Sequence, residues 1–96
     1  MDVFTPMWVY ILECADGSYY TGVTHNLHAR VHAHMHHCGA EYTKKHGPVK
    51  LVYFEEHPSH APARKREEEI KLLTHDQKRE IVESMHDEVE KFILRQ

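Results

Sequence analysis

The distribution of apolar residues near the start of the chain predicts two short β-strands. Residues 7–14 are mostly β-branched, aromatic or aliphatic, and they end just before Asp16-Gly17. A second run of strand-forming residues, 18–23, follows at once and contains Gly22. Two such runs around an Asp-Gly pair are typical of a β-hairpin. Because glycine weakens a strand interior, Gly22 indicates that a backbone or a ligand approaches closely there.

Helical periodicity begins directly after this hairpin. Asn26 is a suitable N-cap, and apolar residues then recur at every fourth position. We therefore expect a helix over about 26–37, closed by Gly39. Its core-facing stripe is Leu27, Val31 and Met35.

Two further helices are predicted in the C-terminal third. Ser59 can cap a helix over about 60–73. Thr74 with Gln77 three residues later has the pattern of a capping box, which begins a last helix that runs to about residue 95. The apolar stripe of this last helix has helical spacing and consists of Ile81, Val82, Met85, Val89, Phe92 and Ile93.

A third strand over 49–55 separates the first helix from the second. Its nearly continuous apolar run predicts a central or well-covered position in the sheet. Residues 38–48, with two glycines and a proline, are expected to form a loop. The order β-β-α-β-α-α predicts a mixed α/β (α+β) fold over residues 1–96, in one domain with no linker or repeat.

Charge is distributed unevenly along the 96-residue chain. The net charge is −3, but residues 1–66 hold 7 Lys/Arg against 6 Asp/Glu, and 9 of the 11 histidines. The remaining residues hold 5 Lys/Arg against 9 Asp/Glu. The first two-thirds can therefore present a mildly basic face to an anionic partner, with an acidic C-terminal third beside it.

The sequence shows no apolar stretch of the length of a membrane span and no basic leader followed by an apolar segment. The two cysteines, Cys14 and Cys38, do not make a disulfide framework. We therefore expect a cytoplasmic protein, or a nuclear one if the source is eukaryotic or viral, that does not associate with membranes.

Four polar residues in the predicted hairpin and first helix are candidates for chemistry. Tyr10 and Tyr20 come from paired strands and can be near neighbours, although tyrosine is also an ordinary strand residue. Arg30 and His34 are four residues apart and share one helix face beside the apolar stripe. A guanidinium and an imidazole in this position suit a groove that binds phosphate, and an ordinary boundary pair is the alternative.

The run Glu67-Glu68-Glu69 falls in the second predicted helix. Glu67 lies nearest to that helix's apolar stripe, while Glu68 faces away from it. A carboxylate at the edge of the core can hold a Mg²⁺ ion shared with a phosphate. The alternative is a surface ion pair with Lys71, four residues further on.

A row of histidines occupies the opposite face of the first predicted helix. His28, His32 and His36 recur at intervals of four, and two such histidines can bind zinc. The general-base glutamate of the metalloprotease motif is missing here, and so is a third ligand at a fixed distance. A solvated polar face is therefore the expected structure, with a His-rich metal-binding protein as an alternative hypothesis.

Taken in order, these residues resemble the GIY-YIG nuclease family. Trp8-Val9-Tyr10 stands where the family has Gly-Ile-Tyr, and Tyr20-Thr21-Gly22 stands where it has Tyr-Ile-Gly. Arg30, His34 and a carboxylate in the helix after the third strand, here Glu67, follow in the family's order. The resemblance covers about residues 7–83 and is closest to the small stand-alone members.

The resemblance implies a three-stranded antiparallel sheet flanked by helices and a metal-dependent endonuclease that acts on DNA. Tyr10, assisted by Tyr20 or His34, would help to deprotonate the attacking water, which requires nearby cations to lower the phenol's pKa. Arg30 would neutralise the phosphate oxygens. Glu67 would hold Mg²⁺ or Mn²⁺ beside the leaving 3′-oxygen.

The resemblance also suggests how single-stranded, duplex or branched DNA would be bound. Gly22 would let the phosphate backbone approach the sheet edge, and Lys44, Lys45 and His46 would contact phosphates from the loop. A single domain with one metal site would nick one strand, so the protein is expected to act as a monomer, or as a homodimer to cut both. A catalytically weak nucleic-acid-binding module of the same fold is the alternative, and a role in DNA repair or recombination with a protein partner is compatible with either.

Overall fold

Strand-forming residues on both sides of a tight turn build the N-terminal hairpin, as predicted. The computed structural model describes residues 5–36, 45–47 and 49–95. Strand β1 (Met7–Cys14) pairs antiparallel with β2 (Tyr19–Thr24). In the turn, Gly17 has a φ of 84°, which favours glycine, and the Asp16 carboxylate accepts hydrogen bonds from the Ser18 backbone at 3.0 Å and hydroxyl at 2.6 Å.

Strand β3 (Val49–His57) pairs antiparallel with the other side of β1, which gives the order β2-β1-β3. Strand β1 is therefore the central strand, and of the two positions predicted for β3, central or well covered, the structure shows the well-covered one. The apolar run in β3 is explained, because helices on both sides of the sheet contact this strand. The register shifts where Ile11 faces Tyr53 and Leu12 faces Leu51, so Val52 forms a β-bulge.

Helix α1 (Leu27–Met35) begins as predicted, since the Asn26 side chain accepts a hydrogen bond from the Ala29 backbone N–H at 3.1 Å. Leu27 and Val31 are buried. Met35 is 52% exposed, however, and His34 is buried in its place. The predicted apolar stripe is wrong at this end, and a polar side chain of the candidate site lies in the core-facing position.

Helix α3 (His60–Lys71) follows β3, and helix α4 (His75–Ser84) begins at the predicted capping box. The Gln77 N–H donates to the Thr74 hydroxyl at 3.1 Å, and the Thr74 N–H donates to the Gln77 side chain at 2.9 Å. Ser59 occupies the N-cap position of α3 as expected, but its side chain makes no capping hydrogen bond.

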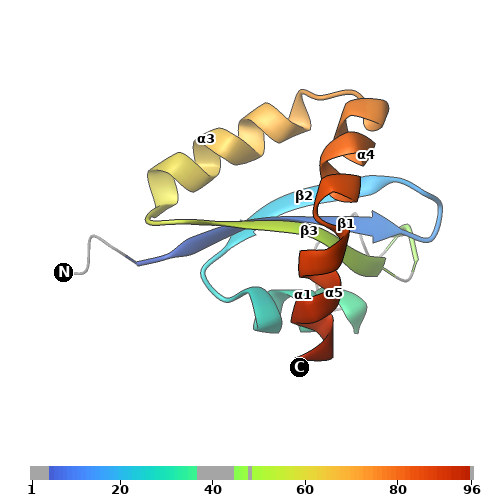
Figure 1. Ribbon diagram of the computed structural model, residues 1–96, viewed down its shortest axis with the longest axis horizontal. Helices are drawn as coiled ribbons and strands as arrows, with labels where there is room; N and C mark the ends of the chain where they lie inside the picture. The colour runs from blue at the N-terminus through green and yellow to red at the C-terminus, as the bar shows by residue number, and fades with distance from the viewer. Residues whose placement is uncertain (1–4, 37–44, 48, 96) are drawn as a thin grey trace.

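The single last helix that the periodicity predicts is divided into α4 and α5 (His86–Leu94) at Met85. Two interactions account for the break. The Ser84 hydroxyl donates to the Ile81 carbonyl at 2.6 Å, and the Phe54 backbone N–H donates to the Met85 sulfur at 3.4 Å. The change of direction carries α5 across β3, as Figure 1 shows.

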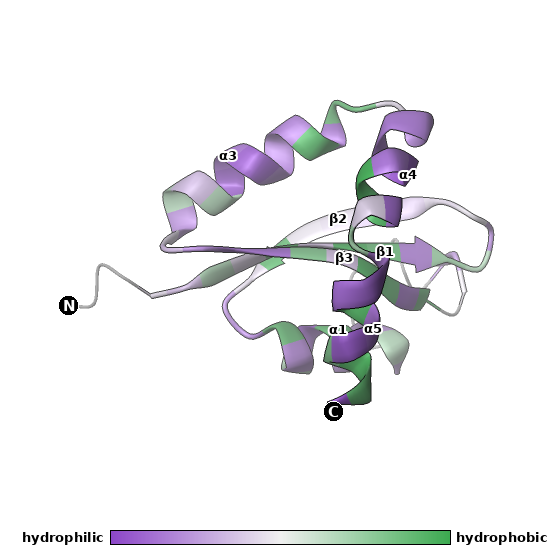
Figure 2. Ribbon diagram, viewed as in Figure 1, coloured by the Kyte–Doolittle hydropathy of each residue, from purple (hydrophilic) through white to green (hydrophobic). Residues whose placement is uncertain are grey.

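The sheet separates two layers of helices and two apolar clusters. Helices α3 and α4 lie on one face, and α1 and α5 lie on the other (Figure 1). Alternate residues of β1 enter the two clusters, as the two-residue period of a strand requires. Figure 2 shows hydrophobic residues along β1 and part of β3, between helices that carry both hydrophilic and hydrophobic residues. Tyr10 is buried on the α1 face, and Glu67 belongs to α3 on the other. No helix in the described part of the chain combines the length and apolar character that crossing a membrane would require.

Candidate active site

The phenol of Tyr10 lies over the edge strand β2. Tyr10 faces Gly22 in the β1–β2 register. A Cβ atom at position 22 would stand 2.7 Å from the Tyr10 hydroxyl and 2.8 Å from its Cζ. From the sequence, we expected the missing side chain of Gly22 to let a phosphate approach. In the structure, the Tyr10 ring occupies the space that a side chain at position 22 would take, so the glycine makes room for the phenol.

Tyr20 and His34 complete an aromatic cluster around Tyr10. Tyr20 faces Leu12 in the register, which puts it on the same face of the sheet as Tyr10, and the two ring centroids are 6.3 Å apart. The His34 ring lies 5.2 Å from that of Tyr20, and its Nε2 is 3.1 Å from the Tyr10 hydroxyl. The expected proximity of the two tyrosines is therefore present, and the imidazole joins them from α1.

Arg30 lies one helical turn before His34 and brings a positive charge to the cluster. Hydrogen bonding to the Tyr10 phenol raises the pKa of the Arg30 guanidinium, and Tyr20 acts in the same direction. Arg30 is half-buried, so part of its guanidinium remains accessible to a ligand. Tyr10, Tyr20, Arg30 and His34 thus form one group on the α1 face.

Burial dominates the ionisation of this group. Desolvation raises the pKa of Tyr10 to about 12, although Arg30 acts to lower it. Burial thus outweighs the nearby cation in the protein without metal or substrate, and the lowered pKa that a tyrosine base would require is not present in this state. Burial, reinforced by the Arg30 charge, lowers the pKa of His34 to about 4. Near neutral pH the phenol and the imidazole are both uncharged, and their contact is a neutral hydrogen bond.

Glu67 approaches from the other face of the sheet. Its side chain is buried on α3, and its two oxygens make ion pairs with Arg64 Nε at 3.3 Å and with Lys71 Nζ at 3.2 Å. Glu68 is exposed, as predicted. The predicted ion pair with Lys71 is therefore present, but the carboxylate is also buried at the edge of the core. Desolvation is the main cause of the raised pKa of Tyr10, and the charge of Glu67 is a minor one in the same direction.

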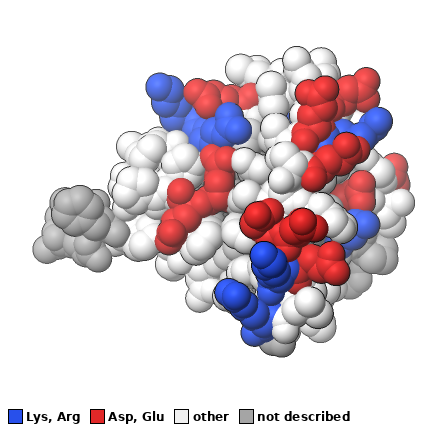
Figure 3. All heavy atoms as spheres, viewed as in Figure 1, with Lys and Arg blue, Asp and Glu red and all other residues white. Residues whose placement is uncertain are grey.

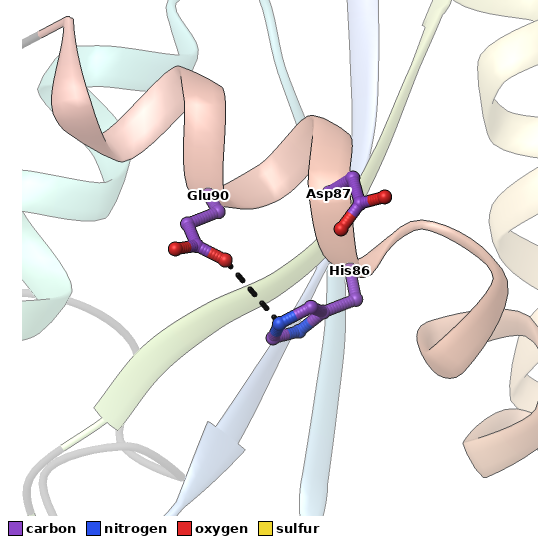
Figure 4. A group of neighbouring side chains, drawn as sticks. All are labelled: His86, Asp87 and Glu90. Carbon is purple, nitrogen blue, oxygen red and sulfur yellow. Dashed lines mark ion pairs between the residues drawn. The ribbon is translucent and has the colours of Figure 1, made fainter.

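Glu67 offers a single buried carboxylate to a Mg²⁺ ion, but both of its oxygens pair with Arg64 and Lys71, which would have to move aside for the ion to bind. This ion typically takes one or two carboxylates and completes its shell with water and substrate phosphate oxygens. The described residues include one group of three potential ligands, His86, Asp87 and Glu90, which Figure 4 shows on α5. That group is exposed and lies on a helix that contacts β3, the opposite edge of the sheet from β2. Glu67 is therefore the better fit to the expected metal.

The predicted phosphate-binding loop is only partly described. Lys44 lies outside the described residues, and Lys45 is exposed. His46 Nδ1 contacts the Asp16 carboxylate at 2.5 Å, so this imidazole faces an acidic group of the hairpin turn. The pairing weakens the case for His46 as a phosphate ligand, while the case for Lys45 is unchanged.

The histidine row of α1 is exposed, as expected for a polar face. His28 stacks on Phe92 with a centroid distance of 4.4 Å, and the rings of His32 and His36 are 4.1 Å apart. These histidines do not belong to the group of three potential metal ligands found among the described residues. Stacking against α5 gives His28 a packing role.

A polar network between β3 and α3 was missed in the sequence. The Glu55 carboxylate accepts a hydrogen bond from the Tyr53 hydroxyl and contacts His57 Nε2 at 2.7 Å and Arg66 Nε at 3.0 Å. Tyr53, Glu55 and His57 alternate along β3 and share one face, which is the signal that could have revealed the network. It fixes α3, and with it Glu67, against the sheet.

Comparison with known proteins identifies the family. The family model of the GIY-YIG catalytic domain matches residues 6–80. The chain therefore belongs to the GIY-YIG family, which is a family of nucleases.

The relatives are small UPF0213 proteins of bacteria. One from Clostridium perfringens is 52% identical over 77 residues, which are 80% of this chain and 83% of the relative. Another, from Staphylococcus epidermidis, is 46% identical over 76 residues, which are 79% of this chain and 93% of the relative. The solution NMR structure of a UPF0213 protein from Bacillus halodurans is 40% identical and has a TM-score of 0.56, with 84% of this chain and 86% of that chain covered. The expected family and fold are thus confirmed.

Proposed function

We propose that this protein is a divalent-metal-dependent endonuclease that hydrolyses phosphodiester bonds in DNA. The observation that carries the proposal is the position of the two halves of the candidate site. The Tyr10 cluster lies on one face of the sheet, and Glu67 lies on the other, on helix α3, which contacts both β1 and β2. Because β2 is an edge strand, a DNA strand that lies along this edge can contact both halves.

Arg30 would bind the scissile phosphate. Its guanidinium offers paired donors to two phosphate oxygens and keeps its charge at any physiological pH. Its neighbours Tyr10 and Tyr20 hold it in place. Negative charge that builds on the phosphorus oxygens during attack would be stabilised by a group that is already oriented.

Glu67 would hold the metal ion, Mg²⁺ or Mn²⁺. When bound, the ion would supply Lewis-acid stabilisation of the leaving 3′-oxygen. Arg64 and Lys71 now neutralise the Glu67 carboxylate. Both cations are more than half exposed, so they can turn towards the DNA backbone when the carboxylate binds a metal.

The neutral Tyr10–His34 pair provides a path for the proton of the attacking water. Tyr10 would accept this proton at its hydroxyl oxygen and pass its own proton to His34 Nε2, 3.1 Å away, with Nδ1 carrying the proton of the resting imidazole. The Arg30 charge is one of the two causes of the low pKa of His34. A phosphate on Arg30 offsets that charge, so the substrate itself makes His34 a stronger base.

The test is cleavage of single-stranded, duplex and branched DNA with Mg²⁺ or Mn²⁺. We expect metal-dependent nicking by the wild type and a loss of about 100-fold or more for Glu67→Gln, while Glu68→Gln, an exposed neighbour, cleaves like the wild type. DNA binding without metal should survive in both variants. Equal activity of the two variants would contradict the assignment of Glu67.

A second candidate function is a DNA-binding module without turnover. The ion pairs that occupy both oxygens of Glu67 favour it, because they compete with a metal ion. In that case the wild type would retard DNA in a salt-dependent way and release no product with either metal. For both candidates we propose DNA repair or recombination in the cytoplasm as the setting, with a monomer that nicks one strand and a homodimer that cuts both.

A further inference from the structure

A groove of about 750 Å³ lies away from the candidate active site, between β3 and the two C-terminal helices. Its apolar lining comes from β3, α4 and α5. Its polar lining holds more carboxylates than cations: Lys50 pairs with Glu13 at 3.3 Å and His86 with Glu90 at 3.3 Å, and Glu83 is exposed. The residues that matter most are Val52, Val82, Val89, Ile93, Glu83 and Glu90. None of the five candidate catalytic residues lines it, and it lies at the β3 edge, across the sheet from β2.

The charge around the groove favours a cationic ligand over nucleic acid. Helices α4 and α5 together carry six Asp/Glu against three Lys/Arg. Figure 3 shows several acidic side chains on this face of the molecule, with Lys and Arg side chains beside them. A phosphate backbone would be repelled here, whereas a cationic partner would be attracted.

A ligand of this groove must also cover exposed apolar side chains. Ile93 is 49% exposed, and Val52 and Val82 are only half-buried, so apolar surface remains in contact with water. The bulge at Val52 bends β3 at this point, and α5 turns away from α4 at Met85. A rim with more carboxylates than cations around an apolar floor complements a segment that is apolar on one side and basic on the other.

We propose that this groove docks a short basic amphipathic segment of a partner protein. Apolar side chains of the segment would cover Val82 and Ile93. Its Lys or Arg side chains would pair with Glu83 and would replace His86, 3.3 Å away, as the partner of Glu90. The docking site would be occupied at the same time as the β2 edge, because the two edges of the sheet face different directions. The proposal does not depend on nuclease activity.

Binding of a synthetic amphipathic helix made of lysine and leucine, labelled with fluorescein, tests the proposal. Fluorescence anisotropy should detect binding of this peptide and not of the matching glutamate–leucine peptide. The double substitution Glu83→Lys/Glu90→Lys should weaken binding about tenfold or more. Glu68→Lys/Glu88→Lys changes the net charge equally at exposed positions outside the groove and should have a much smaller effect.

A second pair of substitutions tests the apolar part of the groove. Ile93→Ser should weaken peptide binding about tenfold, because it removes apolar surface from the interface, and Leu94→Ser, which is more exposed and outside the groove, should not. Amide shift changes in NMR spectra should gather on residues 50–52 and 82–93. If the two double charge reversals weaken peptide binding equally, the proposal is overturned. It is also overturned if sedimentation detects a dimer that Ile93→Ser dissociates, because a second copy of the chain would then occupy the groove.

Discussion

Gly22 and Tyr10 are spatially interdependent, since a Cβ on Gly22 would lie 2.7 Å from the Tyr10 hydroxyl. Residue 22 therefore decides where the phenol lies, and the phenol in turn contacts His34 and Arg30. The glycine of the Tyr20-Thr21-Gly22 motif is a steric requirement of the tyrosine on the neighbouring strand.

Gly22→Ala is expected to destabilise the fold by about 1–3 kcal/mol and to displace the phenol, because the added methyl group overlaps the ring. Urea unfolding measures the loss. The matched experiment repeats the substitution in a Tyr10→Leu background, where the distal ring atoms are gone and the cost should largely disappear. A cost that is the same in both backgrounds would show that the clash with Tyr10 is not its cause.

Tyr10→Phe should separate chemistry from packing. The ring stays in place, so stability should fall by only about 1 kcal/mol, while single-turnover DNA cleavage should fall about 100-fold through loss of the hydroxyl that contacts His34. Tyr19→Phe is the control, because Tyr19 is the neighbouring residue on β2 and stacks on His75, 4.6 Å away, outside the cluster. If Tyr19→Phe reduces cleavage as much as Tyr10→Phe, the hydroxyl of Tyr10 has no special role.

The sequence was sufficient to predict most of the fold because the strongest local signals agree with the packing. The Asp16-Gly17 turn, the Asn26 cap and the Thr74 capping box all occur where predicted. The break at Met85 was missed, since it depends on a contact with Phe54, which lies 31 residues earlier in the chain. No local pattern reports such a contact.

The sequence was sufficient to predict which residues form the candidate site, but not how they are arranged in space. Spacing put Arg30 and His34 on one helix face, and strand pairing brought Tyr10 near Tyr20. That Glu67 approaches from the other side of the sheet follows from the topology, which the sequence does not state. The protonation states of Tyr10 and His34 could not be predicted from the sequence either, because burial determines them and burial depends on the whole fold.

The low pKa of His34 predicts a stability that depends on pH. The folded state holds this pKa at about 4 against an ordinary value of 6.5, so between these pH values the unfolded state binds more protons. Stability should therefore rise with pH across this window, and a contribution of up to about 3 kcal/mol should be lost as the pH falls towards 4. Urea unfolding at a series of pH values measures it. His34→Gln should flatten the profile, whereas His32→Gln, on the exposed face of α1, should leave the slope unchanged.

The Glu55 network gives the last prediction, which concerns the attachment of α3. Burial opposes ionisation of Glu55, but hydrogen bonds from Tyr53 and His57 and the charge of Arg66 prevail and lower its pKa.

Glu55→Gln removes the charge that holds these donors, so we expect a loss of about 1–3 kcal/mol in the free energy of unfolding at neutral pH. The difference from the wild type should shrink as the pH falls and the Glu55 carboxyl becomes protonated, because a depressed pKa stabilises the fold only above its titration range. Glu56→Gln, on the exposed neighbouring residue, should have little effect at any pH. If both substitutions cost the same, the network does not anchor α3, and the position of Glu67 must depend on the apolar contacts of Ala63 and Ile70 alone.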